Sequence, residues 1–414
     1  MRIAFFCPHS DPLAQPGEPD AGGQCVYEAQ VATCLAQLGH EVRCLTRRYG
    51  DKLSHEAIAK GAEVFRFPMG PEGFLRKEDM GPYLAEFIQQ VIADQRAWLE
   101  GPTVFHGHYW DGGVSALEAS LALGKPLVFT SHSLGVLKRD RVPDPTPDGS
   151  GFRYPVRISA ERRIIEAADR IIALSEVERR ALTGRYGAKT ERIHIVPGGV
   201  DVAAYAPRRT KAILKAALGI RTDFMVFTVG RLDPRKGFVE LIAALPLVVA
   251  SLERSGKSVT FLLPSGPEHP SPEEAAYKQI MQTEAEARNV SRHIRWFPRL
   301  SDEDLKLHYA AADLFVCPSP YEPFGLVLVE AFAAGTPVVT TSHGGPREIV
   351  TPGEDGYLAE PSDAEAFGAC IVDVLARDEK ERDAMAKAAI AKARKRYAWS
   401  AVARRIAAIY EELV

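Results

Sequence analysis

The chain has 414 residues, a formal net charge of -3 and the composition of an ordinary globular protein. This length exceeds what one hydrophobic core usually supports, so two domains are expected, and the near-neutral charge argues against nucleic acid as the main partner. The six cysteines include no C-x-x-C pair, which is typical of reduced cytoplasmic thiols and argues against both disulfides and a zinc site.

The first residues form a strand-like run at 3–6 and lack the basic start and cleavage site of a signal peptide, so we expect a cytoplasmic protein. No apolar run reaches the length of about 18 residues that a membrane-spanning helix needs. At the other end, residues 392–410 predict a basic amphipathic helix. Packing against the protein's own surface is favoured over membrane contact for this helix.

Short apolar or β-branched runs alternate with longer stretches of helical period, which is typical of βα repetition. The first series of expected strands comprises residues 3–6, 41–46, 63–66, 103–105, 127–130, 170–173 and 193–196. The second series comprises residues 224–229, 260–264, 294–297, 314–317, 337–340 and 356–359. The pattern therefore predicts an α/β protein with two doubly wound parallel sheets.

A turn-rich segment at residues 196–207 separates the two series and places the expected domain boundary near Pro207. We expect residues 1–207 to form the first domain, 208–395 the second and 396–414 a C-terminal helix. Ligands of doubly wound sheets bind beyond the carboxyl ends of the strands. Two such domains facing each other predict a cleft, with the functional residues in the turns that follow strands.

Paired glycines, Gly22 and Gly23, follow a loop that contains Asp20 and precede a helical pattern. Such a turn lets backbone N–H groups approach an anion at a helix N-terminus. The alternative is a flexible loop that ends in a helix cap.

Two histidines, His106 and His108, follow the fourth expected strand and lie near Asp111 in the sequence. This spacing suggests a metal site, but the sequence shows no further cluster of ligand residues. Packing is therefore the better interpretation of His106. Tyr109, at the end of the same strand, is well placed to meet a substrate.

His132 directly follows the fifth expected strand, where its ring can donate a hydrogen bond to a sugar oxygen. Lys138 comes shortly after it and can meet a phosphate. Between residues 138 and 163, basic residues outnumber acidic ones in a segment rich in proline and glycine. A solvated face is the alternative interpretation, but the position after His132 indicates an anionic acceptor.

Two further patterns lie in the second half. Arg231 and Lys236 occur where a strand turns into a helix, which predicts a diphosphate site. Glu322 and Glu330 flank a helix that starts at Gly325, and carboxylates there suit sugar hydroxyls. Together these residues indicate an enzyme that holds a nucleotide-diphosphate sugar. Residues 302–304, after Ser301, are interpreted as helix capping, and no metal is expected.

With these motifs in place, the whole chain resembles the retaining glycosyltransferases of family 4, which have the GT-B fold. It is most similar to the branch of sucrose-phosphate synthase and mannosylfructose-phosphate synthase. The resemblance implies two Rossmann-like domains around a central cleft, with the C-terminal helix packing back on the N-terminal domain. It rests on residues 20–24, 76–78, 108–113, 132–138, 157–161, 231, 236, 322, 330 and 344–346.

The resemblance implies that the C-terminal domain binds the donor. Arg231 and Lys236 would hold the diphosphate, Glu330 the ribose and Glu322 the transferred sugar, with His132 near its C6 hydroxyl. The implied donor-binding residues are Gly22, Gly23, Arg231, Lys236, Leu300, Glu322, Phe324, Gly325, Leu326 and Glu330. The residues implied to act in catalysis are His132, Glu322, Arg231 and Lys236.

The N-terminal domain would bind the acceptor, with Gly23 and Gln24 on its sugar and basic side chains on its phosphate. The implied acceptor-binding residues are Gly23, Gln24, Lys77, Tyr109, Ser133, Lys138 and Arg157. A neighbouring branch, which transfers N-acetylglucosamine to inositol phosphate, shares part of this pattern: Lys77, Tyr109, a hydroxyl residue at Ser133, and Arg157.

The expected function is retaining, metal-independent transfer of a hexose to a phosphorylated sugar such as fructose 6-phosphate. The donor would be a nucleotide-diphosphate sugar of the UDP-glucose or GDP-mannose type, without any further cofactor. Transfer to inositol phosphate, a lipid or a polysaccharide is the alternative, and membrane contact through the basic C-terminal helix belongs with it. A sugar-nucleotide epimerase is a remote alternative, which the basic acceptor segment disfavours.

Overall fold

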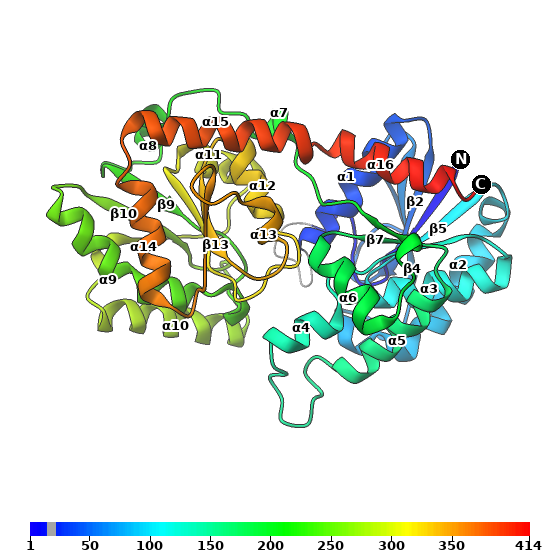
Figure 1. The fold of residues 1–414 in the computed structure, drawn as a ribbon. Coiled ribbons are helices and arrows are strands. Elements are labelled where there is room, and N and C mark those ends of the chain that lie inside the picture. The colour runs from blue at the N-terminus through cyan, green and yellow to red at the C-terminus, as the bar shows by residue number, and fades with distance from the viewer. Residues whose placement is uncertain (15–21) are drawn as a thin grey trace. The chain divides into compact units, whose positions relative to one another are not determined.

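The computed structural model describes residues 1–14 and 22–414, so Asp20 and Ala21 of the glycine motif lie outside the described residues (Figure 1). The chain divides into two compact units. Residues 1–198 and 399–414 form the first unit, and residues 199–398 form the second. The predicted boundary after Pro207 lies further along the chain than this division.

Within the described residues, the first unit contains an eight-stranded sheet with strand order β3-β4-β2-β1-β5-β6-β7-β8. Its strands are β1 (Arg2–Phe6), β2 (Glu41–Arg48), β3 (His55–Ala59), β4 (Ala62–Pro68), β5 (Thr103–His108), β6 (Leu127–Thr130), β7 (Arg170–Ala173) and β8 (Ile193–Ile195). All neighbouring pairs are parallel except β3 and β4. The sequence analysis missed β3, because this edge strand has no buried residue and lacks an apolar run.

Helices cover this sheet: α1 (Gly23–Gln37), α2 (Leu84–Leu99), α3 (Tyr109–Leu123), α4 (Gly135–Arg141), α5 (Tyr154–Ala167), α6 (Glu176–Tyr186) and α16 (Trp399–Glu411). Three short 3-10 helices, η1 (Lys77–Asp79), η2 (Gly81–Tyr83) and η3 (Thr190–Arg192), complete the unit. The C-terminal helix α16 packs against α1, as the resemblance implied. A buried hydrogen bond of 2.6 Å between Tyr410 Oη and His106 Nδ1 anchors it to the sheet.

The second unit contains a six-stranded parallel sheet of order β11-β10-β9-β12-β13-β14. Its strands are β9 (Phe224–Phe227), β10 (Val259–Pro264), β11 (Ile294–Phe297), β12 (Leu314–Cys317), β13 (Val338–Thr341) and β14 (Gly356–Ala359). Its helices are α7 (Val202–Tyr205), α8 (Lys211–Ala217), η4 (Pro234–Lys236), α9 (Phe238–Arg254), α10 (Pro272–Ala287), η5 (Ser291–His293), α11 (Asp302–Ala311), α12 (Leu326–Ala333), α13 (Pro346–Ile349), α14 (Ala364–Leu375) and α15 (Glu379–Arg396). The predicted capping role of Ser301 is confirmed, because its hydroxyl accepts a hydrogen bond from Asp304 N.

The prediction of one helix over residues 392–410 is wrong, because the helix breaks between α15 and α16. At the break, the carbonyl of Tyr397 accepts a hydrogen bond of 2.7 Å from Val200 N, and Ala398 forms a β-bridge with Val200. The backbone there pairs with a distant segment instead of continuing the helix. Among the described residues, no helix is both long and apolar enough to cross a membrane.

Glycines allow α3 to lie very close to the central strand β1. A Cβ atom at Gly112 would lie 2.1 Å from the carbonyl oxygen of Phe6, which is far inside van der Waals contact. Tyr109, the first residue of α3, has a left-handed backbone with φ 64°. The tight turn from β5 into α3 therefore fixes the position of Tyr109.

We expect Gly112→Ala to destabilise the protein by about 3 kcal/mol or more, because the added methyl group collides with backbone that cannot move aside. Gly184→Ala is the matched control, since Gly184 also lies inside a helix but has nothing within 4 Å of the added atom. This control should be neutral or stabilising by up to about 1 kcal/mol. Thermal and urea unfolding measure both effects, and similar stability of the two variants would contradict the close-packing argument.

Candidate functional site

The predicted site residues fall into two groups, one in each unit. In the second unit, Arg231 and Lys236 lie between β9 and α9, on the loop that ends in η4. Gly237 follows with φ 70°, and a Cβ atom there would lie 1.9 Å from the carbonyl oxygen of Pro318. The cationic loop is thereby packed against the segment that follows β12.

Not every cation of this loop is available for a ligand. Arg235 is bound to Asp233, with 2.9 Å from its Nε to each carboxylate oxygen. Burial raises the pKa of Asp233, but the hydrogen bond and charge of Arg235 outweigh this and lower it to about 2. Arg231 is exposed, and Lys236 Nζ lies 3.2 Å from Glu322 Oε2. Arg231 and Lys236 are thus the cations that an anionic ligand can meet.

Glu322 is held by a turn of glycines. Its carbonyl accepts a hydrogen bond of 3.1 Å from Gly345 N, and a Cβ atom at Gly344 would lie 2.1 Å from that same oxygen. Gly325, with φ 104°, precedes the first residue of α12, Leu326, and Phe324 is buried beside it. Because the first N–H groups of a helix have no partner within it, α12 begins with donors that can bind a ligand.

Glu330 lies inside α12, so the prediction that it flanks this helix is wrong. Its Oε2 accepts a hydrogen bond of 3.0 Å from Tyr309, and Tyr205 donates to it as well. Burial raises the pKa of Glu330 to about 7, although both hydrogen bonds lower it. Leu300 lies in the loop between β11 and α11, half-buried. Apart from Glu330, the predicted donor residues of this unit follow the carboxyl ends of strands or begin the next helix.

In the first unit, Gly22 and Gly23 lie at the start of α1, as predicted. Gly22 is the N-cap with extended backbone, and Gly23 is the first helical residue. The side-chain nitrogen Nε2 of Gln24 donates a hydrogen bond of 2.8 Å to Glu28 Oε1. The side chain of Gln24 is therefore oriented by a buried carboxyl group that the sequence analysis did not consider.

Tyr109 and Arg157 are brought together by the fold. Arg157 Nη1 donates a hydrogen bond of 2.6 Å to Tyr109 Oη, and the guanidinium carbon lies 4.3 Å from the centre of the tyrosine ring. Burial by itself would lower the pKa of Arg157, but Tyr109 and Glu161 raise it, so the group stays charged. Its Nη2 is buried and has no hydrogen-bond partner among the described residues. An oxygen atom of a ligand would satisfy this buried donor.

Glu161 is a site residue whose role the sequence analysis missed. It accepts a hydrogen bond of 2.8 Å from Arg157 Nε and two of 3.0 Å from Gly135 N, and it is also bonded to Tyr186. A Cβ atom at Gly135 would lie 3.0 Å from its Oε2, so a larger residue there would have to displace the Glu161 carboxylate. The spacing of four residues between Arg157 and Glu161 was the signal that could have revealed it.

The two predicted lysines of the acceptor group occupy different surroundings. Lys138, on α4, is buried with its Nζ 4.0 Å from the centre of the Phe152 ring. Lys77 begins η1, and its Nζ lies 3.8 Å from Glu78 Oε1. Ser133 lies half-buried between β6 and α4.

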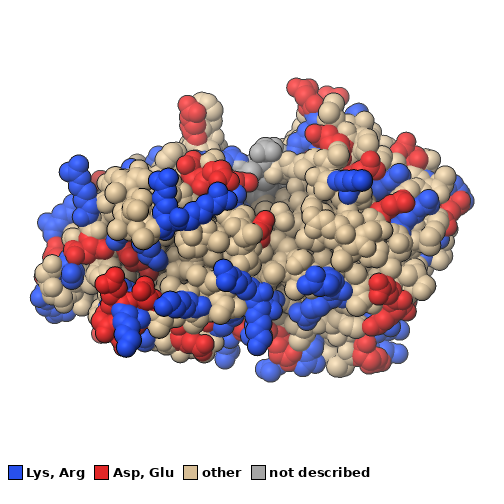
Figure 2. Space-filling view, turned by 90° about the horizontal axis from the view of Figure 1, so that it is seen from above, with Lys and Arg blue, Asp and Glu red and all other residues tan. Residues whose placement is uncertain are grey.

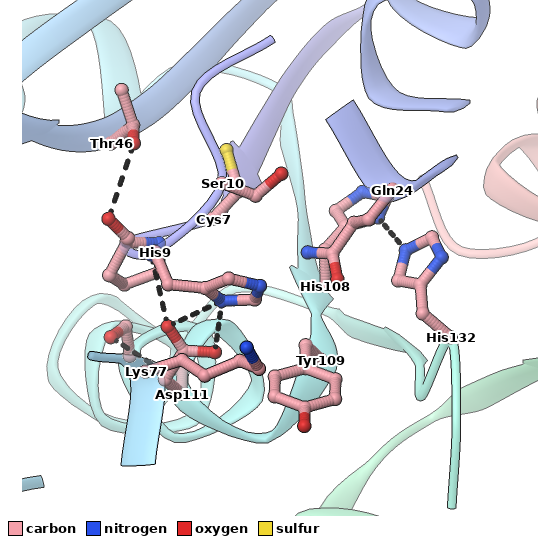
Figure 3. A network of polar contacts seen from close by, with 12 residues as sticks. Cys7, His9, Ser10, Gln24, Thr46, Lys77, His108, Tyr109, Asp111 and His132 are labelled. Atoms are coloured by element: carbon pink, nitrogen blue, oxygen red, sulfur yellow. Dashed lines mark hydrogen bonds and ion pairs between the residues drawn. The ribbon is translucent and has the colours of Figure 1, made fainter. Parts of the chain in front are cut away.

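Asp111 bonds to His9, which the sequence analysis did not single out. One carboxylate oxygen accepts a hydrogen bond of 3.1 Å from His9 N, and both oxygens lie 2.9 Å from His9 Nδ1 (Figure 3). The His9 ring lies 4.9 Å from the ring of Tyr109, between centres. No sequence pattern indicates this pair, because about a hundred residues separate its members.

His106 packs in the core as predicted, bonded to Tyr410 and, at 2.8 Å, to Thr130 Oγ1. Burial lowers its pKa to about 3, so the ring is neutral. The expectation that no further ligand residues lie near the two histidines is wrong, because Glu28 and His132 lie beside His108. Possible ligand atoms of these three residues all lie within 4.8 Å of one another.

Comparison with known proteins identifies the family of the chain. Residues 210–392 match the model of "Glycosyl transferases group 1", and residues 21–204 match that of "Glycosyltransferase Family 4". A mannosylfructose-phosphate synthase of Agrobacterium fabrum is 30% identical over 99% of this chain and 91% of its own length. A D-inositol 3-phosphate glycosyltransferase of Thermobispora bispora is 32% identical over 99% and 94%.

Among solved structures, a sucrose-phosphate synthase from Thermosynechococcus elongatus matches with a TM-score of 0.85 and 28% identity over 100% of this chain and 98% of its own. Anabaena HepE, solved in complex with UDP-glucose, matches with a TM-score of 0.72 and 22% identity over the whole of both chains, which supports the fold. The chain belongs to glycosyltransferase family 4 and has the GT-B fold. It is a hexosyltransferase that transfers a sugar from a nucleotide sugar.

The raised pKa of Glu330 predicts a pH-dependent stability. The folded protein keeps a proton on this group up to about pH 7, whereas the unfolded chain releases it near pH 4.5. The wild type should therefore lose stability relative to Glu330→Gln as the pH rises through this window, by up to about 3 kcal/mol. Urea unfolding of both proteins at about pH 5 and pH 8.5 measures this. The same difference in stability at both pH values would contradict the raised pKa.

Proposed function

We propose that this enzyme transfers a hexose, with retention of configuration and without a metal, to a small phosphorylated sugar, fructose 6-phosphate being the first candidate. The donor is a nucleotide-diphosphate sugar of the UDP-glucose or GDP-mannose type. Similarity to a mannosylfructose-phosphate synthase and a sucrose-phosphate synthase over nearly the whole chain supports this choice.

The observation that carries the phosphate part of the proposal is the buried Nη2–H group of Arg157, which has no hydrogen-bond partner among the described residues. Charged groups are rarely buried without a full set of hydrogen bonds, because the loss of hydration is costly. A phosphate oxygen satisfies this N–H with a charge-assisted hydrogen bond. Lys138 and Lys77 add positive charge in the same unit, and Tyr109 and Ser133 supply hydroxyl groups for the rest of the acceptor.

On the donor side, Arg231 and Lys236 neutralise the diphosphate as the glycosidic bond breaks into an oxocarbenium-like state. The incoming hydroxyl attacks from the face that the diphosphate leaves, and a phosphate oxygen takes its proton. Glu322 orients the sugar and does not form a covalent intermediate, in contrast to the nucleophile of a retaining glycosidase. Its carboxylate accepts a hydrogen bond from Lys236, and a bound diphosphate competes for that ammonium group.

Inositol phosphate is the second candidate acceptor, because several relatives that are 31–34% identical carry the name D-inositol 3-phosphate glycosyltransferase. A lipid or polysaccharide acceptor is less favoured. On the face shown in Figure 2, basic and acidic side chains alternate in small groups, whereas binding to an anionic membrane surface requires a concentration of basic groups.

Release of nucleoside diphosphate tests the proposal. UDP-glucose, GDP-mannose and ADP-glucose are each incubated in EDTA alone, with fructose 6-phosphate and with inositol phosphate. We expect release to require one donor together with one phosphorylated acceptor, and the linkage of the product to retain the donor's anomeric configuration. If neither phosphorylated acceptor stimulates release from any donor, the proposed acceptor class is wrong, and activity that EDTA abolishes would contradict metal independence.

Arg157→Lys should reduce kcat/KM for the phosphorylated acceptor by about 10- to 100-fold, because lysine cannot bond Tyr109, Glu161 and a phosphate at once. Slow release of nucleoside diphosphate without acceptor should be unchanged. Arg163→Lys is the matched control, since Arg163 lies on the same helix but is exposed and paired with Glu118 at 2.9 Å. Equal acceptor kinetics in the two variants, with unchanged melting temperatures, would contradict the assignment of Arg157.

A further inference from the structure

His108 and His132 form a hydrogen bond between two imidazole rings inside the first unit. His108 Nδ1 lies 2.8 Å from His132 Nε2, and the rings are stacked with 5.1 Å between their centres. Tyr27 packs edge-on against His132 at 4.9 Å. The backbone of His132 is left-handed, with φ 53°, an unusual conformation for a residue other than glycine that holds the ring in this position.

Both rings are neutral, because burial lowers the pKa of each histidine well below its usual range. A neutral imidazole has one N–H donor and one bare nitrogen, so one ring must donate to the other. The bond therefore has a direction, and that direction decides which nitrogen of His132 carries its proton.

The surroundings of His108 select the direction. Its second nitrogen, Nε2, is buried and has no hydrogen-bond partner among the described residues. If His132 were the donor, His108 would carry its proton on this Nε2, and a buried N–H would lack a partner. Unsatisfied buried N–H groups are rarer and more costly than unsatisfied acceptors. With His108 as the donor, Nε2 is the bare nitrogen and this cost is avoided.

A carboxyl group favours the same direction. Glu28 Oε1, which accepts the hydrogen bond from Gln24, lies 3.9 Å from His108 Nδ1, so its partial negative charge favours a proton over a lone pair on that nitrogen. Glu28 is itself oriented by Ser10 Oγ, 2.7 Å from Oε2, and by Gln24 Nε2, 2.8 Å from Oε1. Because both oxygens accept these hydrogen bonds, the carboxyl group is held in place beside His108.

We propose that His108 is a positioning residue that donates from Nδ1 to His132 Nε2 and thereby holds His132 as the Nδ1–H tautomer, a hydrogen-bond donor to an oxygen of the transferred sugar. The side chain of His132 is partly buried, and Figure 3 shows its second ring nitrogen on the side away from His108. Within the described part of the chain, no residue bonds to that nitrogen. The identity of the oxygen, the C6 hydroxyl, rests on the proposed function, whereas the tautomer does not.

The tautomer is measured without any substrate. Enzyme labelled with 15N-histidine gives nitrogen–proton correlation spectra that distinguish Nδ1–H from Nε2–H rings, and His132→Gln assigns the signals of His132. We expect the Nδ1–H form for both His108 and His132 in the wild type. An Nε2–H form of His132 would overturn the proposal, whatever the variants below show.

Two variants of His108 separate its hydrogen bond from its bulk. His108→Asn places an amide N–H near the position of Nδ1, so it should keep His132 in the Nδ1–H form. His108→Leu fills similar space without a donor, so it should release His132 to a mixture that contains the Nε2–H form. Circular dichroism and melting temperature check that both variants are folded. If the leucine variant does not fold, the wild type and His108→Asn spectra still decide the question.

The kinetic readout compares the nucleotide sugar that the wild type uses with its 6-deoxy analogue, which lacks the C6 oxygen. The preference for the full sugar in kcat/KM should fall by about 3- to 10-fold in His108→Leu and should persist in His108→Asn. An unchanged preference in the leucine variant would overturn the proposed contact with the sugar. Lack of transfer by the wild type contradicts the proposed function instead and leaves the tautomer measurement valid.

A metal ion is the rival occupant of this cluster, because Glu28, His108 and His132 are possible ligands. Calorimetric titration of the wild type with Zn²⁺ alone decides between a bound metal ion and the hydrogen bond between the two histidines. Stoichiometric binding that alters the His108 and His132 signals would overturn the proposal, since an ion would replace the N–H···N hydrogen bond. Absence of binding, together with the Nδ1–H spectrum, supports it.

Discussion

The buried ion pair of Arg157 and Glu161 is the interaction on which the N-terminal site depends. A guanidinium group this far from water must be paired and hydrogen-bonded, or it would destabilise the fold. Glu161 meets this need, and with its remaining capacity it binds the first N–H of α4, the helix that carries Lys138. One carboxylate therefore places both a cation and a helix, and it leaves one N–H of Arg157 for a ligand.

In the second unit, close backbone packing positions the cationic loop and the Glu322 turn. Gly237 and Gly344 each lie where a side chain would collide with a carbonyl oxygen, so only glycine permits the cationic loop and the Glu322 turn to come this near to their neighbours. Two side chains of opposite charge, Lys236 and Glu322, are in contact there. A diphosphate and a sugar hydroxyl can each take over one partner of this pair.

The histidines of the first unit differ from Arg157 in their charge state. Arg157 stays charged because Tyr109 and Glu161 accept hydrogen bonds from it. The buried His106 and His108 and the partly buried His132 have no ionised partner in hydrogen-bond contact among the described residues, so burial makes them neutral. A neutral imidazole ring has one donor nitrogen and one acceptor nitrogen. A hydrogen bond at one nitrogen therefore fixes the role of the other. The first unit thus combines a charged contact suited to phosphate with a neutral, oriented donor suited to a sugar oxygen.

The sequence by itself determined the two parallel sheets, the strand ends and the residues that follow them, because apolar runs and glycine turns are local signals. It could not show β3, whose exposed edge position leaves no apolar pattern, or the break at Tyr397, which depends on a partner at Val200. Only the tertiary structure decided that His9 meets Asp111, that Glu28 lies near His108 and that Arg157 Nη2 has no partner among the described residues. Such contacts join residues far apart in the chain. The direction of their hydrogen bonds depends on which buried polar atoms would otherwise lack a partner.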